Sequence, residues 1–328
     1  MIKFGIIGTN FISDWMADAA LKVEDIELTA VFSRKEQTGR AFAQKHGIGT
    51  VYTDLSQMLS SDIVAVYVAS PTFKHYEHSL CALNAGKHVL CEKMLTVRLS
   101  EAEHLASVAR EKGLVLMEAM RPLHDPAIYI IKEALPKLGR IRRVHFEYCQ
   151  YSSRYDAFKQ GRVLNAFDPT IGNSALADIG IYPLAMTLSL FGEPKRVSTM
   201  STFLENGFEC MGEIAMDYGD MRATVSYSKI NEGVRRSVIE GEDASISVSK
   251  LSAVSDIDLV YRDGTVQSLK SDVIEGTNMD CELRDFCDAI KGVKGHNGWL
   301  DTALLQLKIA EISYSQNGTA DKFDYSDK

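Results

Sequence analysis

Short apolar runs alternate with helical stretches over about the first 119 residues of the chain. The expected strands span residues 3–7, 27–32, 63–69, 88–91 and 114–117. Several of these runs are apolar on both faces, which is typical of buried parallel strands. Gly86 and Gly113 follow two of the expected helices, in the position where a left-handed residue ends a helix. The pattern predicts βαβ units and a doubly wound parallel sheet of the Rossmann type.

Beyond residue 120 the pattern changes to long alternating segments. The expected elements are a helix near 126–134, a strand at 143–148, a helix near 176–190, strands at 197–203, 209–218, 221–228 and 236–248, and helices near 281–291 and 302–315. Alternating segments joined by turn signals predict antiparallel pairing. A chain of 328 residues is long for one core. We therefore expect a dinucleotide-binding domain over 1–119 and an α+β domain over 120–328, with a large, mainly antiparallel open sheet.

Composition and charge exclude several classes of protein. No apolar run approaches the ~18 residues of a membrane span, and the first residues lack the pattern of a secretory signal, so we expect a cytoplasmic protein. The net charge of −8 argues against a nucleic-acid partner. The six cysteines contain no C-x-x-C pair, which argues against a disulfide framework and a zinc site. His75 and His78 lack a convincing third ligand, so no metal is expected.

The turn between the first expected strand and the first expected helix is an imperfect dinucleotide-binding fingerprint. Its residues are Gly8, Thr9, Asn10, Phe11, Ile12 and Ser13. Only the first glycine is kept, but asparagine tolerates a left-handed backbone and serine is small, so the turn is still expected to form. The pyrophosphate would rest on the amides at the helix N-terminus. An ordinary strand–turn–helix without a ligand is the alternative.

The second expected strand ends without the carboxylate that binds the ribose hydroxyls of NAD. A hydroxyl and two cations, Ser33, Arg34 and Lys35, stand there instead. This set fits a 2′-phosphate held by Ser33 and Arg34, which favours NADP over NAD. Solvated loop charges are the alternative, since Glu36 follows at once.

Several motifs in order resemble one family of oxidoreductases. They are Ser70-Pro71-Thr72 with His75, the run Ala85 to Lys93 ending in Glu92-Lys93, Met117 to Met120, and Ala175 to Tyr182 with Asp178, Gly180 and Tyr182. The chain resembles the Gfo/Idh/MocA family of glucose-fructose oxidoreductase and inositol 2-dehydrogenase, nearest to its trans-dihydrodiol dehydrogenase branch. The likeness spans nearly the whole chain.

The resemblance implies hydride transfer between NADP or NAD and a carbinol or carbonyl carbon of a sugar, inositol or dihydrodiol. It places Lys93 beside the nicotinamide, with Asp178 and Tyr182 supplied by the second domain. Tyr182 is interpreted as the acid/base, Lys93 as its electrostatic partner and a hydrogen-bond donor to the substrate, and Asp178 as the group that orients both. Which of Lys93 and Tyr182 takes the proton stays open. It also implies that the cofactor lies against the residues Gly8 to Ile12, Ser33, Arg34, Ser70, Pro71, Thr72, His75, Glu92 and Lys93.

The bare sequence supports part of this interpretation. Asp178 and Tyr182 are four residues apart and would share a helix face. Gly180 between them costs the helix about 1 kcal/mol unless a ligand or backbone must approach closely. Taken singly, Lys93 could be a surface lysine, Asp178 a charge favoured by the helix dipole, and Tyr182 a core residue. His75 lines the cofactor cleft or is a helix-face histidine.

The chain departs from the family pattern at several places. Met94 replaces the usual proline after the Glu-Lys pair, and Arg121 to His124 replace the run expected of the dihydrodiol branch, so the substrate does not transfer. Asn165, Phe167 and Asp168 precede the expected helix and are candidates to line the substrate pocket; loop capping is the alternative for Asn165 and Asp168. The alternatives are a non-catalytic dinucleotide-binding sensor and a reductase of a C=N bond or tetrapyrrole. An apolar outer face of the open sheet is expected, covered in a homodimer or higher oligomer.

Overall fold

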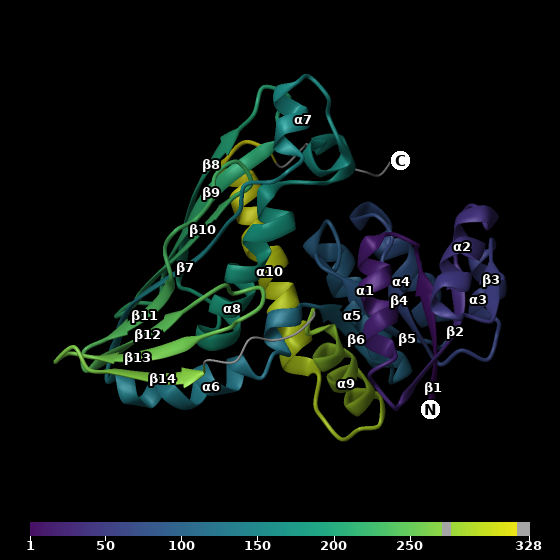
Figure 1. Cartoon of the computed structure of the whole chain (residues 1–328), viewed down its shortest axis with the longest axis horizontal. Helices are drawn as coiled ribbons and strands as arrows, with labels where there is room; N and C mark the ends of the chain where they lie inside the picture. The colour runs from purple at the N-terminus through teal and green to yellow at the C-terminus, as the bar shows by residue number, and fades with distance from the viewer. Residues whose placement is uncertain (271–276, 320–328) are drawn as a thin grey trace. The chain divides into compact units, whose positions relative to one another are not determined.

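The computed structural model describes residues 1–270 and 277–319, which form two compact units (Figure 1). The first unit comprises Met1–Arg121 and the described part of Gly276–Leu304, and the second comprises the described parts of Pro122–Glu275 and Leu305–Lys328. The chain passes from the first unit to the second between Arg121 and Pro122, close to the expected boundary at residue 120. The sequence did not predict that the chain returns to the first unit near its end.

The first unit is built on a six-stranded parallel sheet with the order β3-β2-β1-β4-β5-β6. Its strands are β1 (Ile2–Ile7), β2 (Ile26–Phe32), β3 (Thr50–Tyr52), β4 (Ala65–Val68), β5 (His88–Glu92) and β6 (Leu116–Ala119). The order reverses between β1 and β4, as in a doubly wound nucleotide-binding fold. The predicted Rossmann sheet is confirmed. Strand β3 was not predicted, because three residues are too few to show a period.

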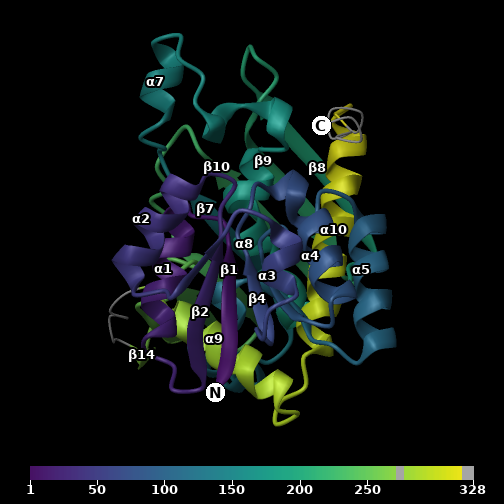
Figure 2. The ribbon, with the colours of Figure 1, turned by 90° about the vertical axis from the view of Figure 1, so that its right-hand side faces the viewer.

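Helices cover both faces of this sheet. They are α1 (Phe11–Ala20), α2 (Glu36–His46), α3 (Leu55–Leu59), α4 (His75–Asn84), α5 (Leu99–Lys112) and α9 (Met279–Ile290). Figure 2 shows α1, α2 and α9 on one side of the sheet and α3, α4 and α5 on the other. The returning helix α9 adds Met279, Leu283 and Phe286 to the core, where Phe286 meets the Phe4 ring edge-on at 6.2 Å. It therefore completes the core of the first unit.

The second unit contains an eight-stranded sheet with the order β14-β13-β12-β11-β7-β10-β9-β8. Its strands are β7 (Ile141–Cys149), β8 (Arg196–Phe203), β9 (Glu209–Asp217), β10 (Arg222–Ser228), β11 (Ser237–Gly241), β12 (Ala244–Val248), β13 (Ile257–Tyr261) and β14 (Val266–Lys270). Among these strands only β7 and β10 pair in parallel, which confirms the mainly antiparallel open sheet. The single strand predicted over 236–248 is wrong. It is the β11–β12 hairpin, which turns where Gly241 lies against Leu138.

Helices of the second unit pack on one face of its sheet, apart from the short helix at Tyr155–Lys159, which lies beyond the strand ends (Figure 1). They are α6 (Ala127–Ala134), α7 (Tyr155–Lys159), a π-helix (Leu176–Gly180), α8 (Ile181–Phe191) and the part of α10 (Asn297–Gln316) beyond residue 304. Short 3-10 helices lie at Thr72–Lys74, Arg121–Leu123, Leu135–Leu138, Asn165–Phe167 and Pro169–Ile171. Val144 and Phe146 of β7 and Val225 of β10 are fully buried on the covered face, where α8 packs.

The other face of the sheet does not have the expected apolar character at its centre. Its side chains on β7, β9 and β10 are largely polar and include His145, Glu147, Glu213, Thr224 and Ser226. The expectation is wrong because alternation along each strand places apolar residues under α8 and polar residues on the opposite side.

The described residues contain neither a candidate membrane span nor a candidate metal site. No helix within 1–270 and 277–319 combines the length and apolar character needed to cross a membrane. Within the same ranges, no three histidine, cysteine or acidic side chains gather as ligands for a metal ion.

Candidate active site

The nucleotide loop begins at Gly8, directly after β1. Gly8 has φ +113°, and a Cβ atom at this position would lie 2.7 Å from the carbonyl oxygen of Ala69. Its amide donates a hydrogen bond of 3.0 Å to the Phe32 carbonyl at the end of β2. Both the backbone angle and the close approach therefore require glycine here.

Asn10, at the second glycine position of the fingerprint, is the N-cap of α1. Its Oδ1 accepts hydrogen bonds from the amides of Ile12 and Ser13, both at 3.1 Å, and its Nδ2 donates to the Ala69 carbonyl at 2.8 Å. The backbone of Asn10 is extended, with φ −87°, so tolerance of the left-handed region is not the reason that asparagine fits. The helix start is formed by a side-chain cap instead.

The end of β2 presents a cation to solvent. The side chain of Arg34 is exposed and makes no ion pair or hydrogen bond within residues 1–270 and 277–319. The Ser33 hydroxyl lies 2.8 Å from that of Thr38, and Glu36 forms an ion pair of 2.6 Å with Arg40. The Glu36 carboxylate thus pairs with Arg40, one turn further along α2, and not with Arg34. The Arg34 guanidinium is therefore available to bind an anion.

His75 ties together the segments that follow β4 and β5. Its Nδ1 lies 2.8 Å from the Met94 carbonyl oxygen and its Nε2 lies 2.8 Å from that of Ser70. Burial lowers the pKa of His75 to about 4, which outweighs the two hydrogen bonds that favour the charged ring. At neutral pH the ring is therefore neutral and donates to one of the two carbonyls. Its side chain fixes backbone positions.

The remaining candidate cofactor residues lie around these loops. Phe11 is 59% exposed and meets the Trp15 ring edge-on at 5.6 Å, whereas Ile12 packs against the core of the unit. Pro71 is exposed and Thr72 partly buried where a 3-10 helix begins, and Thr9 is partly buried beside Gly8.

Lys93 follows β5 in a backbone segment that buried side chains hold in place. The Lys93 amide donates to Glu92 Oε2 at 3.2 Å, while the Tyr67 hydroxyl donates to the other oxygen of Glu92. The next peptide bond, Lys93–Met94, is cis, and the Leu95 amide donates to Glu118 at 2.8 Å. Burial raises the pKa of Glu92, although the Lys93 ammonium opposes the shift.

Sequence reasoning did not assign roles to Tyr67 and Glu118. The available signal was a polar group inside an apolar strand run: both side chains are buried, in β4 and β6. Such groups are retained when they satisfy specific partners.

Asp178 and Tyr182 lie on either side of a change in helix type. Asp178 is in the π-helix and Tyr182 is in the first turn of α8, where its ring meets that of Tyr148 edge-on at 5.6 Å. The side chain of Asp178 is 45% exposed, whereas Tyr182 is largely buried. A single α-helix was predicted here, because the sequence signals do not distinguish a short π-helical turn from α-helix.

Gly180 makes room for an aromatic ring. A Cβ atom on Gly180 would lie 2.6 Å from Cγ of Tyr227. The sequence suggested that a ligand or backbone approaches this glycine, but the group that approaches is a side-chain ring. The Tyr227 hydroxyl donates to Glu209 at 2.8 Å, and the Leu176 amide at the start of the π-helix donates to the same carboxylate at 3.1 Å. Glu209 and Tyr227 thereby fix the helix turn that carries Asp178.

A second lysine, which the sequence reasoning missed, lies beside Asp178. Lys229 directly follows β10, and its Nζ is 2.8 Å from Asp178 Oδ2. Its side chain is only 4% exposed. The signal in the sequence was a lysine immediately after an alternating strand, a position that resembles an ordinary solvated strand end.

The loop before the π-helix contributes mainly structural contacts. Phe167 is fully buried and lies 4.8 Å from the Phe208 ring, and Asp168 accepts a hydrogen bond of 2.8 Å from the Thr170 amide as a cap. Asn165 is exposed, and its carbonyl accepts from the Asn173 side chain at 2.6 Å. The capping interpretation therefore describes Asp168, and Phe167 is a core residue of the second unit.

Comparisons with known proteins assign the chain to a family. Residues 2–120 match the model of an oxidoreductase family with an NAD-binding Rossmann fold, and residues 134–247 match the GFO/IDH/MocA C-terminal domain. The chain belongs to the GFO/IDH/MocA oxidoreductase family. The predicted resemblance is confirmed, and the first unit is the NAD-binding Rossmann domain of an oxidoreductase.

Relatives agree with this assignment. The scyllo-inositol 2-dehydrogenase (NADP(+)) IolU of Bacillus subtilis strain 168 is 38% identical over 97% of this chain and 98% of its own length. A trans-1,2-dihydrobenzene-1,2-diol dehydrogenase of Oryctolagus cuniculus is 27% identical over 66% of this chain and 64% of its own. The fold matches a crystal structure of a 3-ketoreductase from Actinomadura kijaniata in complex with NADP and TDP-benzene, with a TM-score of 0.83 and 23% identity over 96% of this chain and 97% of that one.

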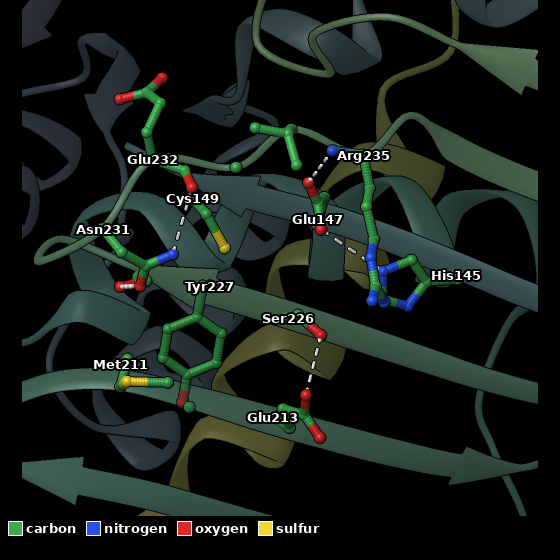
Figure 3. Close-up of a pocket in the computed structure, with 14 residues that line it drawn as sticks. His145, Glu147, Cys149, Met211, Glu213, Ser226, Tyr227, Asn231, Glu232 and Arg235 are labelled. Atoms are coloured by element: carbon green, nitrogen blue, oxygen red, sulfur yellow. Dashed lines mark hydrogen bonds and ion pairs between the residues drawn. The ribbon is translucent and has the colours of Figure 1, made fainter. Parts of the chain in front are cut away.

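A separate pocket lies in the second unit, on its eight-stranded sheet (Figure 3). It has a volume of about 280 Å³ and is lined by side chains of β7, β9, β10 and the loop before β11. His145 lies 3.6 Å from Glu147, and Ser226 lies 3.4 Å from Glu213. None of the candidate catalytic or cofactor residues lines this pocket, and its polar groups largely pair with one another.

Proposed function

We propose that the protein is an NADP-preferring dehydrogenase or reductase of a neutral, polyhydroxylated small molecule of the sugar, inositol or dihydrodiol class. The observation that carries the cofactor preference is Arg34, an exposed cation without a partner among the described residues, beside Ser33 at the end of β2. A guanidinium binds a phosphate through two parallel hydrogen bonds, which a ribose hydroxyl does not offer. The name of the inositol relative, which includes NADP, supports the same choice.

The first unit offers the rest of a dinucleotide site. The loop Gly8 to Ile12 would receive the pyrophosphate at the start of α1. Ser70, Pro71, Thr72 and His75 follow β4, and Glu92 and Lys93 end β5, so both segments lie at the carboxyl edge of the parallel sheet, where such folds bind ligands. We assign the expected domain of residues 1–119 to the cofactor and the domain of 120–328 to the substrate.

Lys93, Asp178 and Tyr182 are proposed to serve the chemical step. Bound NADP would supply the hydride chemistry. For oxidation, the substrate hydroxyl proton passes to Tyr182 in its tyrosinate form or to Lys93 in its neutral amine form, and the same group returns it in the reverse direction. The half-exposed carboxylate of Asp178 accepts a hydrogen bond from a substrate hydroxyl and orients it. An acceptor in this position favours neutral hydroxylated substrates over carboxylic acids.

The resemblance also supports a proposal about the assembly. We propose a homodimer or higher oligomer formed through the sheet of the second unit, with contacts that are polar around Glu147 and Glu213. We also propose that the protein works in the cytoplasm. The absence of disulfides among its six cysteines, all of which lie in the described residues, is consistent with a reducing compartment.

The test is a fluorescence titration with NADPH and with NADH, followed by a turnover screen of sugars, inositols and dihydrodiols. We expect Arg34→Ala to weaken NADPH about 10- to 100-fold, since a charge-assisted hydrogen bond is lost, and to leave NADH almost unchanged. Arg110→Ala, an exposed arginine of α5 in the same unit, is the matched control.

Two outcomes would overturn parts of the proposal. Equal losses of NADPH and NADH in Arg34→Ala would remove the 2′-phosphate assignment. Tight binding without turnover of any substrate would favour the alternative, a non-catalytic dinucleotide-binding sensor. Asn10 in the fingerprint favours that alternative, because its side chain already occupies two amides of the helix start.

A further inference from the structure

We infer that Lys229 is a positioning residue of this active site and acts on the reaction through Asp178. The inference rests on the proposed function, in which Asp178 orients the substrate. Lys229 Nζ lies 2.8 Å from Asp178 Oδ2, yet the lysine side chain is 4% exposed and that of the aspartate is 45% exposed. A substrate arriving from solvent can therefore reach the carboxylate but not the ammonium.

The backbone of Lys229 is fixed on both sides. Its amide donates to the Cys210 carbonyl in β9 at 2.9 Å, and its carbonyl accepts from the Ser152 amide after β7 at 3.0 Å. The lysine thus extends the pairing of β10 with its two neighbours by one residue. A buried stem that starts from an anchored Cα keeps its ammonium in one place, which is what a positioning group requires.

Two aromatic rings enclose the ammonium of Lys229. Its Nζ lies 4.8 Å from the centre of the Phe167 ring and 5.2 Å from that of Phe208. It also donates a hydrogen bond of 2.7 Å to the Ala166 carbonyl. These contacts are attractive for a cation over a ring face. The Lys229 ammonium therefore contacts the 3-10 turn Asn165–Phe167, the rings of Phe167 and Phe208, and the Asp178 carboxylate.

Stability alone does not explain a lysine at this position. Burying an ammonium carries a desolvation penalty, and an apolar side chain of similar length would fill the space between Phe167 and Phe208 without it. Asp178 is half exposed, so it does not need a buried partner in order to remain in the fold. The cation is explained if the reaction requires the Asp178 carboxylate to be charged and held in one orientation.

The decisive experiment is a double-mutant cycle with Lys229→Met and Asp178→Asn. We expect Lys229→Met to lower kcat/KM for the polyol about 10- to 100-fold, the range for a hydrogen bond between charged groups, with NADPH affinity unchanged. In the Asp178→Asn background the same change should alter kcat/KM by less than about twofold, since the two residues act as a unit. Lys229→Arg keeps the charge and should restore part of the loss.

The matched control is Lys308→Met, which removes a lysine of the same unit that pairs with Glu193 at 2.6 Å on the surface. It should leave kcat/KM unchanged. Losses that multiply in the double variant, or normal turnover in Lys229→Met, would overturn the inference.

Failure of the proposed function is seen separately, as a wild-type protein that binds no dinucleotide or turns over no substrate. In that case the double-mutant cycle is measured by thermal unfolding of the same variants. Additive shifts in Tm would then show that Lys229 and Asp178 are not coupled, which would overturn the inference. If Lys229→Met does not fold, Lys229→Gln, which also removes the charge and keeps a polar end for the Ala166 carbonyl, provides the same comparison in the wild-type and Asp178→Asn backgrounds.

Discussion

Glu282 in α9 is a buried carboxylate whose environment favours its protonated form. It is fully buried, and neither of its side-chain oxygens has a hydrogen-bond partner among the described residues. Burial, and then the neighbouring charge of Glu92, raises the pKa of Glu282 well above its ordinary value, while Arg121 opposes the shift. Such a group binds its proton more tightly in the folded chain than in the unfolded one. Its contribution to stability is therefore largest below pH 4 and declines as the pH rises.

We expect Glu282→Gln to stabilise the protein at alkaline pH. The amide cannot ionise, so the variant escapes the loss that wild type suffers as pH rises from the unfolded pKa of about 4.3 toward the higher folded pKa. Calorimetric unfolding should show a gain of at least about 1 kcal/mol at pH 8 that vanishes near pH 4. Glu103→Gln, an exposed carboxylate on α5, should show no such trend. A gain independent of pH would mean that ionisation is not its cause.

At the scale of elements, the start of α1 forms without the second and third glycines of the fingerprint, because Asn10 caps the helix with its side chain. The Asn10 cap takes the amides of Ile12 and Ser13, which a pyrophosphate would otherwise find open. Cap and ligand therefore compete for the same end of the helix.

Substitutions can separate the effect of Asn10 on helix stability from its effect on cofactor binding. Asn10→Ala should destabilise the protein by about 1 kcal/mol, and Asn10→Gly by only a few tenths. Because both free the amides, NADPH should bind Asn10→Gly at least as tightly as wild type, as judged by fluorescence titration beside thermal melts. Asn84→Ala, an exposed asparagine at the end of α4, is the control. Weaker NADPH binding in Asn10→Gly would show instead that the side chain itself contacts the cofactor.

The sequence predicted the elements better than their details. The parallel sheet followed from apolar runs and helix-ending glycines, which are local signals. The π-helix at Asp178, the β11–β12 hairpin and the partner Lys229 were not predicted. Each depends on a contact between distant segments: Tyr227 against Gly180, Leu138 against Gly241, and Asp178 beside a lysine that follows another strand. Local periodicity contains no information about such contacts.

At the scale of the whole molecule, the first unit is discontinuous in sequence. Helix α9 packs against α1, and the core that contains Phe4 and Met16 includes Leu283 and Phe286 from the returning segment. A nucleotide-binding domain cut from the first third of the chain would expose this surface to water.

We therefore expect the fragment of residues 1–121 to fold poorly. Deleting buried side chains as large as phenylalanine costs about 3–5 kcal/mol each, which is a large part of the stability of a small domain. Circular dichroism and NADPH titration should show little cooperative unfolding and little binding by the fragment. The full chain, and the fragment supplemented with a peptide of residues 277–304, should bind. Binding by the fragment alone would show that α9 is dispensable.

The π-helix at Leu176–Gly180 has a consequence for how this segment can change. A π-turn contains one more residue than the α-turn it replaces, so deleting Ile179 or Gly180, which lie between Asp178 and α8, would return the segment to α-helix. Everything before the deletion would then rotate by about 100° around the helix axis, which would turn Asp178 away from Lys229 and from its present relation to Tyr182. The number of residues in this turn, as much as their identity, is therefore under constraint, and insertions or deletions here are less tolerable than substitutions.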